Sequence, residues 1–574
     1  MTGTGRVIEG PPSDDGWSEP AFYRTPLGPS SATLARRGRH RSLADAAAHG
    51  GLLENSRTIA IGSLASRLTG FLRSIALAAA LGVAANGIAD PFNGANSFPN
   101  MLYELLLGGV LASVLIPALV QAQERDSDRG VAFTQRLLSL ATVALGAATL
   151  AAVAAAPVIA WTFVADPDKR HLTTVFGMLL LPEIFFYGLG AMIAAVLNTL
   201  QVYGPPAWAP VLNNLIMLAT LGVFVVMTGG AEPTVSGITA AQILVLGIGT
   251  TLGIAAQAMC LVPSLRRAGF HWRWRFRAVG GAAARMREFR ALAAWVLVYV
   301  ALSQLGIAVI TRIAFSNDGV STFAYAALLF QMPYAILGVS VLTAMMPRLS
   351  RAAARGATAE LLEDLRLGAR LSGVALVPVT AALMVLGPAA TTVMFVGHTT
   401  VDQARLIGTV VALAAFGLFP YALVMLQLRA FYALGDARTP ALVNLAMVVT
   451  EIGLVLPAAL LLDGDRVIEA LGVVTSASYV LGALVGHLAL RRRLGLLGFA
   501  TVVRTVARVT LAAAVGGGAA YCVLLGVHHG LGTGRGSAAI ALVGGATAGA
   551  IVFALVLSRL HVPEAREVLS ALRG

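Results

Sequence analysis

The sequence is poor in charge, in lysine and in cysteine. Only 12% of its 574 residues are charged, 57% are hydrophobic, and all basic residues except Lys169 are arginine. With a mean hydropathy of +0.79, the chain lies outside the range of soluble globular domains. Cys260 and Cys522 fall in separate apolar stretches, so nothing indicates a disulfide framework or a cysteine metal site. Nucleophile-elbow, Walker-loop and metal-ligand spacings are also missing, so we expect no enzyme.

Long apolar stretches make up most of what is present. A helix needs about 20 apolar residues to cross the hydrocarbon core of a bilayer, and about fourteen stretches reach that length. We therefore predict an all-α polytopic membrane protein with about fourteen transmembrane helices. The predicted stretches are 58–81, 92–120, 137–163, 174–200, 207–228, 237–262, 291–315, 320–346, 369–396, 404–433, 438–462, 467–490, 507–526 and 537–559.

The basic residues are concentrated in every second connection between these stretches, while the intervening connections are acidic or mixed. This alternation is the positive-inside pattern. It predicts a multi-pass protein of the cytoplasmic (inner) membrane with both termini in the cytoplasm. The pattern also accounts for the net charge of +13, so we expect no nucleic-acid partner. The basic connections lie within residues 125–136, 266–290, 348–370 and 491–504.

Two parts of the sequence resemble each other. One begins at Ser66 and ends at Pro117, the other begins at Ser303 and ends at Pro347, and both start at an odd-numbered apolar stretch. This predicts two six-helix lobes in a parallel pseudo-twofold repeat, although chance similarity of helices rich in glycine and valine is the alternative. The predicted parts are a disordered cytoplasmic tail (1–56), an N-lobe (57–262), a basic cytoplasmic loop (263–290), a C-lobe (291–490), and two further helices with the cytoplasmic C-terminus (491–574).

Two arginines, Arg67 and Arg73, lie inside the first apolar stretch. An arginine near the bilayer centre costs between about 3 and 15 kcal/mol, so such residues usually face a bundle interior or a water-filled cavity. The two lie about 120° apart on a helix, so they could line two sides of a cavity. Alternatively, one could pair with a carboxylate, for which Asp90 and Glu104 are candidates. Ion pairs that only fix packing are the competing interpretation, but two arginines on one helix favour an anion site.

The basic connection after the sixth stretch interleaves arginine with Trp272, Trp274 and Phe276. Topology anchoring is the simplest role for it. Such a segment can also lie on anionic membrane lipids, at about 1 kcal/mol per basic residue.

Several short motifs are distributed over most of the chain, roughly residues 57–560. They include SRLTGFLR at 66–73, Asp90 followed by FPNML at 98–102, and RAFYALGDARTP at 429–440. These motifs resemble those of the MurJ (MviN) family of lipid II flippases in the MOP exporter superfamily, and the preference for arginine suggests an actinobacterial branch. The resemblance implies a two-lobe fold of fourteen helices with a cationic central cavity. It further implies translocation of an undecaprenyl-pyrophosphate-linked peptidoglycan precursor from the inner to the outer leaflet.

The same resemblance implies the residues that bind substrate. Arg67 and Arg73 would engage the pyrophosphate through charge-assisted, often bidentate hydrogen bonds. Two further basic residues of the family are replaced here by Tyr103 and Leu328, and an acidic one by Gly108. The arginine cavity is therefore only partly present. The candidate substrate-binding residues are Ser66, Arg67, Arg73, Asp90, Asn100 and Glu104.

The leading hypothesis is thus a lipid II flippase that works by alternating access. We expect lipid II, anionic membrane lipids and cell-wall synthesis proteins as partners, and no cofactor. The energy source would be an ion gradient or the membrane potential, with the coupling ion left open. An exporter of another polyprenyl-linked glycan or of a small molecule is one alternative, although a drug exporter would favour cavity carboxylates. A non-transporting scaffold of the cell-wall machinery is another.

Overall fold

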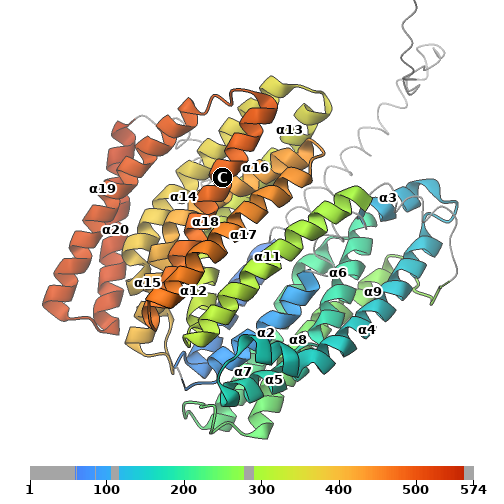
Figure 1. Cartoon of the computed structure of the whole chain (residues 1–574), viewed down its shortest axis with the longest axis horizontal. Coiled ribbons are helices and arrows are strands. Elements are labelled where there is room, and N and C mark those ends of the chain that lie inside the picture. The colour runs from blue at the N-terminus through green and yellow to red at the C-terminus, as the bar shows by residue number, and fades with distance from the viewer. Residues whose placement is uncertain (1–57, 60, 85, 105–115, 277–289, 561–574) are drawn as a thin grey trace, which may run out of the picture. The chain divides into compact units, whose positions relative to one another are not determined.

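The computed structural model describes residues 58–59, 61–84, 86–104, 116–276 and 290–560. The predicted tail (1–56), the end of the basic loop and Gly108 lie outside these residues. Within them the chain is helical and forms no strand, with one isolated antiparallel bridge between Gly87 and Thr234. The all-α prediction is confirmed (Figure 1).

Thirteen helices of the described part are long and apolar enough to cross a membrane. The predicted stretch 92–120 is not among them, because it comprises α2 (Ala89–Tyr103), residues outside the description, and α3 (Ile116–Arg125). Thirteen of the fourteen predicted stretches thus have a membrane-length helix among the described residues, and the remaining one contains residues 105–115, which lie outside them. The chain is an integral membrane protein.

The first half of the chain contains α2, α3 and the first helix (Ile61–Leu81). Its other helices are α4 (Val131–Phe163), α5 (Pro167–Leu180), α6 (Glu183–Thr199), α7 (Gly204–Thr228), α8 (Ala240–Met259) and α9 (Leu261–Arg267). The second half contains α11 (Arg290–Ser316), α12 (Val320–Pro333), α13 (Val339–Ala354), α14 (Thr358–Met394), α15 (Val401–Ala414), α16 (Leu418–Ala433), α17 (Arg438–Leu461) and α18 (Asp465–Leu494). The last two helices are α19 (Ala500–Leu531) and α20 (Arg535–Arg559).

The helices of the two halves pack in the same pattern. In the first half α4 contacts α5 and α6, α8 contacts α5, α6 and α7, and α2 contacts α5. In the second half α14 contacts α15 and α16, α18 contacts α15, α16 and α17, and α12 contacts α15. Each of these contacts in one half therefore has a counterpart in the other, in the same chain order. The predicted parallel repeat is confirmed.

A buried asparagine makes the same connection in each half. Asn214 of α7 donates to the carbonyl oxygen of Ser66 in the first helix, at 3.2 Å. Asn444 of α17 donates to the carbonyl oxygen of Tyr299 and the Oγ of Ser303 in α11, at 2.8 and 2.9 Å. Polar side chains in the hydrocarbon core lack water, so they bond to neighbouring helices and hold them together. Ser66 and Ser303 also begin the two sequence copies.

The two halves are joined at the end of the helices opposite to the basic connections. Lys169, the single lysine of the chain, forms an ion pair with Asp318 between α11 and α12. Thr399, between α14 and α15, donates its hydroxyl to the carbonyl oxygen of Ala78 in the first helix, at 3.0 Å. These bonds hold the two halves together at this end.

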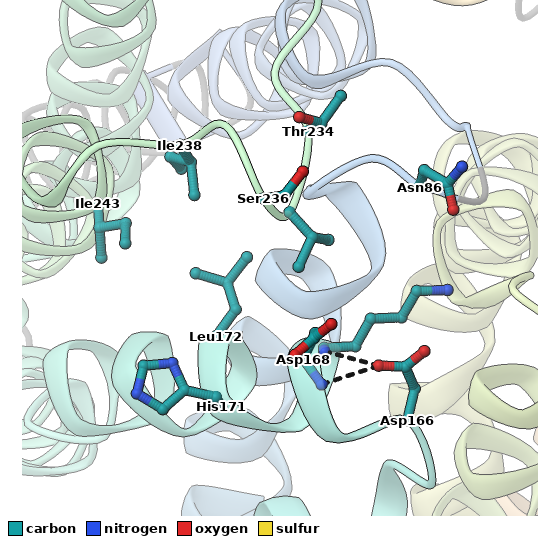
Figure 2. A pocket seen from close by; sticks show the side chains of 11 residues that line it. Asn86, Asp166, Asp168, His171, Leu172, Thr234, Ser236, Ile238 and Ile243 are labelled. Atoms are coloured by element: carbon teal, nitrogen blue, oxygen red, sulfur yellow. Dashed lines mark hydrogen bonds between the residues drawn. The ribbon is translucent and has the colours of Figure 1, made fainter.

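A polar hollow of about 610 Å³ lies at the same end of the first half (Figure 2). Beside it, the carboxylate of Asp166 accepts hydrogen bonds from the backbone nitrogens of Asp168 and Lys169, at 2.9 and 3.0 Å. Asp166 thereby caps α5, because it satisfies backbone donors that the helix itself leaves free. The cap holds in place the turn that carries Lys169 toward the other half.

Close packing of α14 and α15 yields a test of the fold. A Cβ at Gly408 would lie 2.3 Å from Thr391 Oγ1 and 2.4 Å from Pro388 Cα, whereas one at Gly453 would meet nothing within 4 Å. We expect Gly408→Ala to destabilise the protein by about 1–3 kcal/mol through overpacking. Gly453→Ala should be neutral or stabilising by up to about 1 kcal/mol, because alanine favours helix. The midpoint of thermal unfolding in one detergent measures both, and equal midpoints would contradict this packing.

Candidate substrate cavity

The first helix turns one face to lipid and the opposite face inward. Leu64, Leu68 and Leu72 are 51%, 53% and 54% exposed, which marks the lipid-facing side. At about 100° per residue, Arg73 and Ser66 lie about 140° and about 160° from the centre of this side. Arg67 lies about 100° from it, on the flank of the helix. Arg73 therefore occupies the inner face, and Arg67 lies beside it.

Arg73 lies where the two halves meet. Its charge acts on Glu183 and Tyr187 of α6 in the first half and on Tyr325 of α12 in the second. Among the residues that the structure describes, neither Arg73 nor Arg67 has a side-chain hydrogen bond or an ion pair within 4 Å. Both guanidinium groups are only partly buried. As far as the described residues show, both arginines therefore have donors available to an anion.

The charge of Arg73 acts on the carboxyl group of Glu183. Glu183 is not among the candidate site residues predicted from the sequence. Glu183 is 1% exposed, lies in the first turn of α6, and its Oε1 has no hydrogen-bond partner in the described structure. Thr251 is a side-chain hydrogen-bond partner of Glu183, and the positive charge of Arg73 also acts on the carboxyl group. Its position directly after Pro182, in an aromatic-rich apolar stretch, was the only signal in the sequence.

Asp90 is engaged elsewhere. Its buried carboxylate accepts hydrogen bonds from the backbone nitrogens of Val320 and Ser321, at 3.2 and 2.8 Å. These nitrogens begin α12, so Asp90 caps a helix of the other half and complements the positive end of its dipole. Among the described residues Asp90 has no ion pair with an arginine of the first helix, and both of its oxygens accept bonds from α12.

A polar stripe runs along α2. Its members are separated by three, four, three and four residues, a spacing that keeps them on one helix face. Asn93, which the sequence analysis missed, donates to the Oγ of Ser321 and the hydroxyl of Tyr325, at 2.9 and 3.3 Å. The seven-residue spacing between Asn93 and Asn100 is the sequence signal that could have identified Asn93. The stripe comprises Asp90, Asn93, Ser97, Asn100 and Glu104.

An aromatic pair occupies the position where the resemblance led us to expect a further basic residue. The rings of Tyr103 and Tyr187 lie 5.6 Å apart, tilted by 33°. Tyr187 also lies within electrostatic reach of Arg73 and Glu183. The second replaced position, Leu328, is partly exposed on α12. The described surroundings of Arg73 therefore combine the buried Glu183 with the phenol rings of Tyr187 and Tyr325, and Tyr103 packs against Tyr187.

An apolar hollow of about 280 Å³ lies between α14, α19 and α20. Small residues line it, and a Cβ at Gly516 would lie 2.8 Å from the carbonyl oxygen of Gly549, so α19 and α20 approach closely. Close approach through small residues is typical of transmembrane helix pairs. A cavity lined in this way can accommodate a hydrocarbon chain.

The motif at 429–440 has a structural role at the basic end of the second half. Asp436 accepts bonds from the backbone nitrogen and hydroxyl of Thr439, at 2.9 and 2.7 Å, and pairs with Arg493 at 2.6 Å. Partial burial raises the pKa of Asp436, but these hydrogen bonds and the Arg493 charge outweigh it and hold the pKa below its usual value. The residue therefore fixes the turn between α16 and α17 against α18.

Known proteins share this architecture. A solved structure described as the lipid II flippase MurJ in an inward closed conformation covers 88% of this chain and 99% of its own, with a TM-score of 0.69 and 17% identity. An inward-facing multidrug resistance MATE family transporter of the MOP superfamily covers 76% of this chain and 96% of its own, with a TM-score of 0.62 and 13% identity. At these identities the likeness shows the fold alone.

Sequence comparison is more specific. A probable lipid II flippase MurJ of Rhizobium meliloti is 27% identical over 405 residues, which are 68% of this chain and 72% of the relative. The lipid II flippase MurJ of Burkholderia cenocepacia is 26% identical over 414 residues, 68% of this chain and 75% of the relative. The family model for the lipid II flippase MurJ matches residues 77–540, well over half of the chain. The chain therefore belongs to the MurJ family of lipid II flippases.

Proposed function

We propose that this protein moves lipid II from the inner to the outer leaflet of the cytoplasmic membrane by alternating access. Family membership supports the substrate. The observation that carries the mechanism is Arg73 on the inner face of the first helix, which has no hydrogen-bond or ion-pair partner among the described residues and acts electrostatically on both halves. A drug exporter or a scaffold would not need a free cation there.

In this proposal Arg73 and Arg67 bind the pyrophosphate of the substrate. A hydrogen bond to a charged group contributes about 1.5–3 kcal/mol, and guanidinium groups match phosphate oxygens in pairs. Ser66, Asn100 and Glu104 would lie along the path of the head group. Glu183 would hold Arg73 in place while the cavity is empty and would be displaced as its counter-ion by the diphosphate.

The bonds between the halves support a direction for loading. They lie at the end opposite to the basic connections, and the positive-inside pattern assigns the basic end to the cytoplasm. Substrate would therefore enter from the cytoplasmic side. Release would require the Lys169–Asp318 pair and the Asp90 cap on α12 to separate. An ion gradient or the membrane potential would supply the energy.

The lipid tail would remain in apolar surroundings while the head group crosses. The hollow between α14, α19 and α20 supports this, since its small, apolar lining suits an isoprenoid chain. The two helices that follow the repeat thereby acquire a role in guiding the tail.

The first test removes the guanidinium group. We expect Arg73→Ala to weaken lipid II binding by about ten- to a hundredfold, the loss of one or two charged hydrogen bonds. The measurement is the Kd of purified protein for lipid II, together with rescue of a strain depleted of its own flippase. Arg351→Ala, an exposed arginine at the end of α13, is the matched control and should bind and rescue normally.

If Arg73→Ala binds and rescues normally at equal protein levels, the arginine site is wrong. If the unaltered protein rescues growth without binding or flipping lipid II, the scaffold alternative holds instead.

The second test fills the apolar hollow. Gly517 lines it with no atom closer than 3.6 Å to its Cβ position, whereas Gly518 does not line it and meets nothing within 4 Å. Gly517→Phe should therefore reduce transport of full-length lipid II by about tenfold or more, through loss of part of the apolar contact. Gly518→Phe should not, and a short-chain lipid II analogue should be transported equally by both. An equal loss in both variants would exclude a tail-binding role.

The third test concerns the buried carboxylate. Replacing Glu183 by glutamine removes a charge that competes with the diphosphate for Arg73, so binding should tighten. At an effective dielectric constant of about 20 the effect is about 1–2 kcal/mol, or five- to thirtyfold in Kd. Glu451→Gln, a partly buried carboxylate of α17 bonded to Thr475, is the control and should leave the Kd unchanged. Weaker binding by Glu183→Gln would show that Glu183 positions Arg73 rather than competing for it.

A further inference from the structure

A segment at the basic end of the first half plays no part in the proposed transport cycle. Residues 270–276, which we name the aromatic–arginine segment, follow α9 and read Phe-His-Trp-Arg-Trp-Arg-Phe. Phe270 is buried against the helices, but Trp274 and Phe276 are 62% and 55% exposed. Two large exposed rings next to each other are unusual on a surface that faces only water.

The segment is fixed to α4. Gln135 donates to the carbonyl oxygen of His271 at 2.8 Å. The hydroxyl oxygen of Ser139 accepts from the backbone nitrogen of Arg275 at 3.0 Å and from the indole nitrogen of Trp272 at 3.4 Å. The exposed rings are therefore presented by a segment that is itself bonded to a transmembrane helix.

These bonds also set the depth of the segment. At 1.5 Å per residue, α4 with its 33 residues is about 50 Å long, against a hydrocarbon core of about 30 Å. A centred helix then extends about 10 Å beyond each face of the core. Ser139 lies eight residues, or about 12 Å, from the first residue of α4. The segment thus lies at the boundary between hydrocarbon and head groups, where tryptophan is enriched.

The rings and the charges alternate along the segment. Trp272 and Trp274 lie 5.4 Å apart, Trp274 and Phe276 stack at 6.0 Å, and Arg273 and Arg275 between them are exposed. Hollows of about 570 and 590 Å³ adjoin the segment, and none of the described residues that line them is acidic. An anion can therefore reach either arginine without meeting a carboxylate in these hollows.

We propose that the aromatic–arginine segment is a binding site for anionic phospholipids of the leaflet at the basic end of the helices. Its rings insert between acyl chains and head groups, and Arg273 and Arg275 bind lipid phosphates. The role does not depend on the Arg73 site, so it can hold or fail separately from the proposed transport.

The test uses the full-length protein in nanodiscs of phosphatidylcholine alone or of an equal mixture with phosphatidylglycerol. Hydrogen exchange of residues 270–276 and quenching of tryptophan fluorescence by brominated lipid are measured. We expect slower exchange in the anionic discs and stronger quenching by brominated phosphatidylglycerol than by brominated phosphatidylcholine. Trp274→Phe should remove the lipid-specific part of the quenching.

The charge variant is the double change of Arg273 and Arg275 to glutamine. Each arginine near the lipid surface is expected to strengthen local binding of anionic lipid about fivefold. Loss of both should therefore reduce the preference for the anionic lipid about thirtyfold. Arg351 and Arg355 on α13, changed together to glutamine, are the control and should leave the segment's preference intact. The unfolding midpoint and lipid II binding of both double variants should match the unaltered protein, which separates this site from the transport site.

Equal exchange and equal quenching in both kinds of disc would overturn the proposal. So would protection of the segment that requires an added soluble cell-wall enzyme, since the surface would then bind a protein.

Discussion

The absence of water in the hydrocarbon core is the constraint on which the rest of this structure depends. Inside it, polar groups must be satisfied by the chain itself. The two asparagines, Asn214 and Asn444, meet this demand by bonding the first helix of each half, and Asp90 meets it by capping α12. Arg73 and Glu183 depart from this rule. The donors of Arg73 and the Oε1 of Glu183 have no hydrogen-bond partner in the described structure, and the charge of Arg73 acts on Glu183.

Much of this could be predicted from the sequence, because spans, charge alternation and the repeat are properties of local pattern. Arg73 on an inner face also follows from helical periodicity once the exposed leucines are known. The partners of the charged groups could not be predicted. Asp90 bonds to α12 across more than two hundred residues, and Glu183 reaches the first helix through the packing of α6. Such pairings arise only when the helices are assembled.

The closure between the halves and the candidate substrate site share their residues. Tyr325 accepts a bond from Asn93, and both Asp90 and Arg73 act on it electrostatically. If the proposed site holds, a diphosphate at Arg73 would bring negative charge toward the carboxylate that caps α12. In the proposed cycle, repulsion between the two would weaken the cap when substrate is present and would leave it intact when substrate is absent. Loading and opening would then be coupled through α12, without any separate sensor.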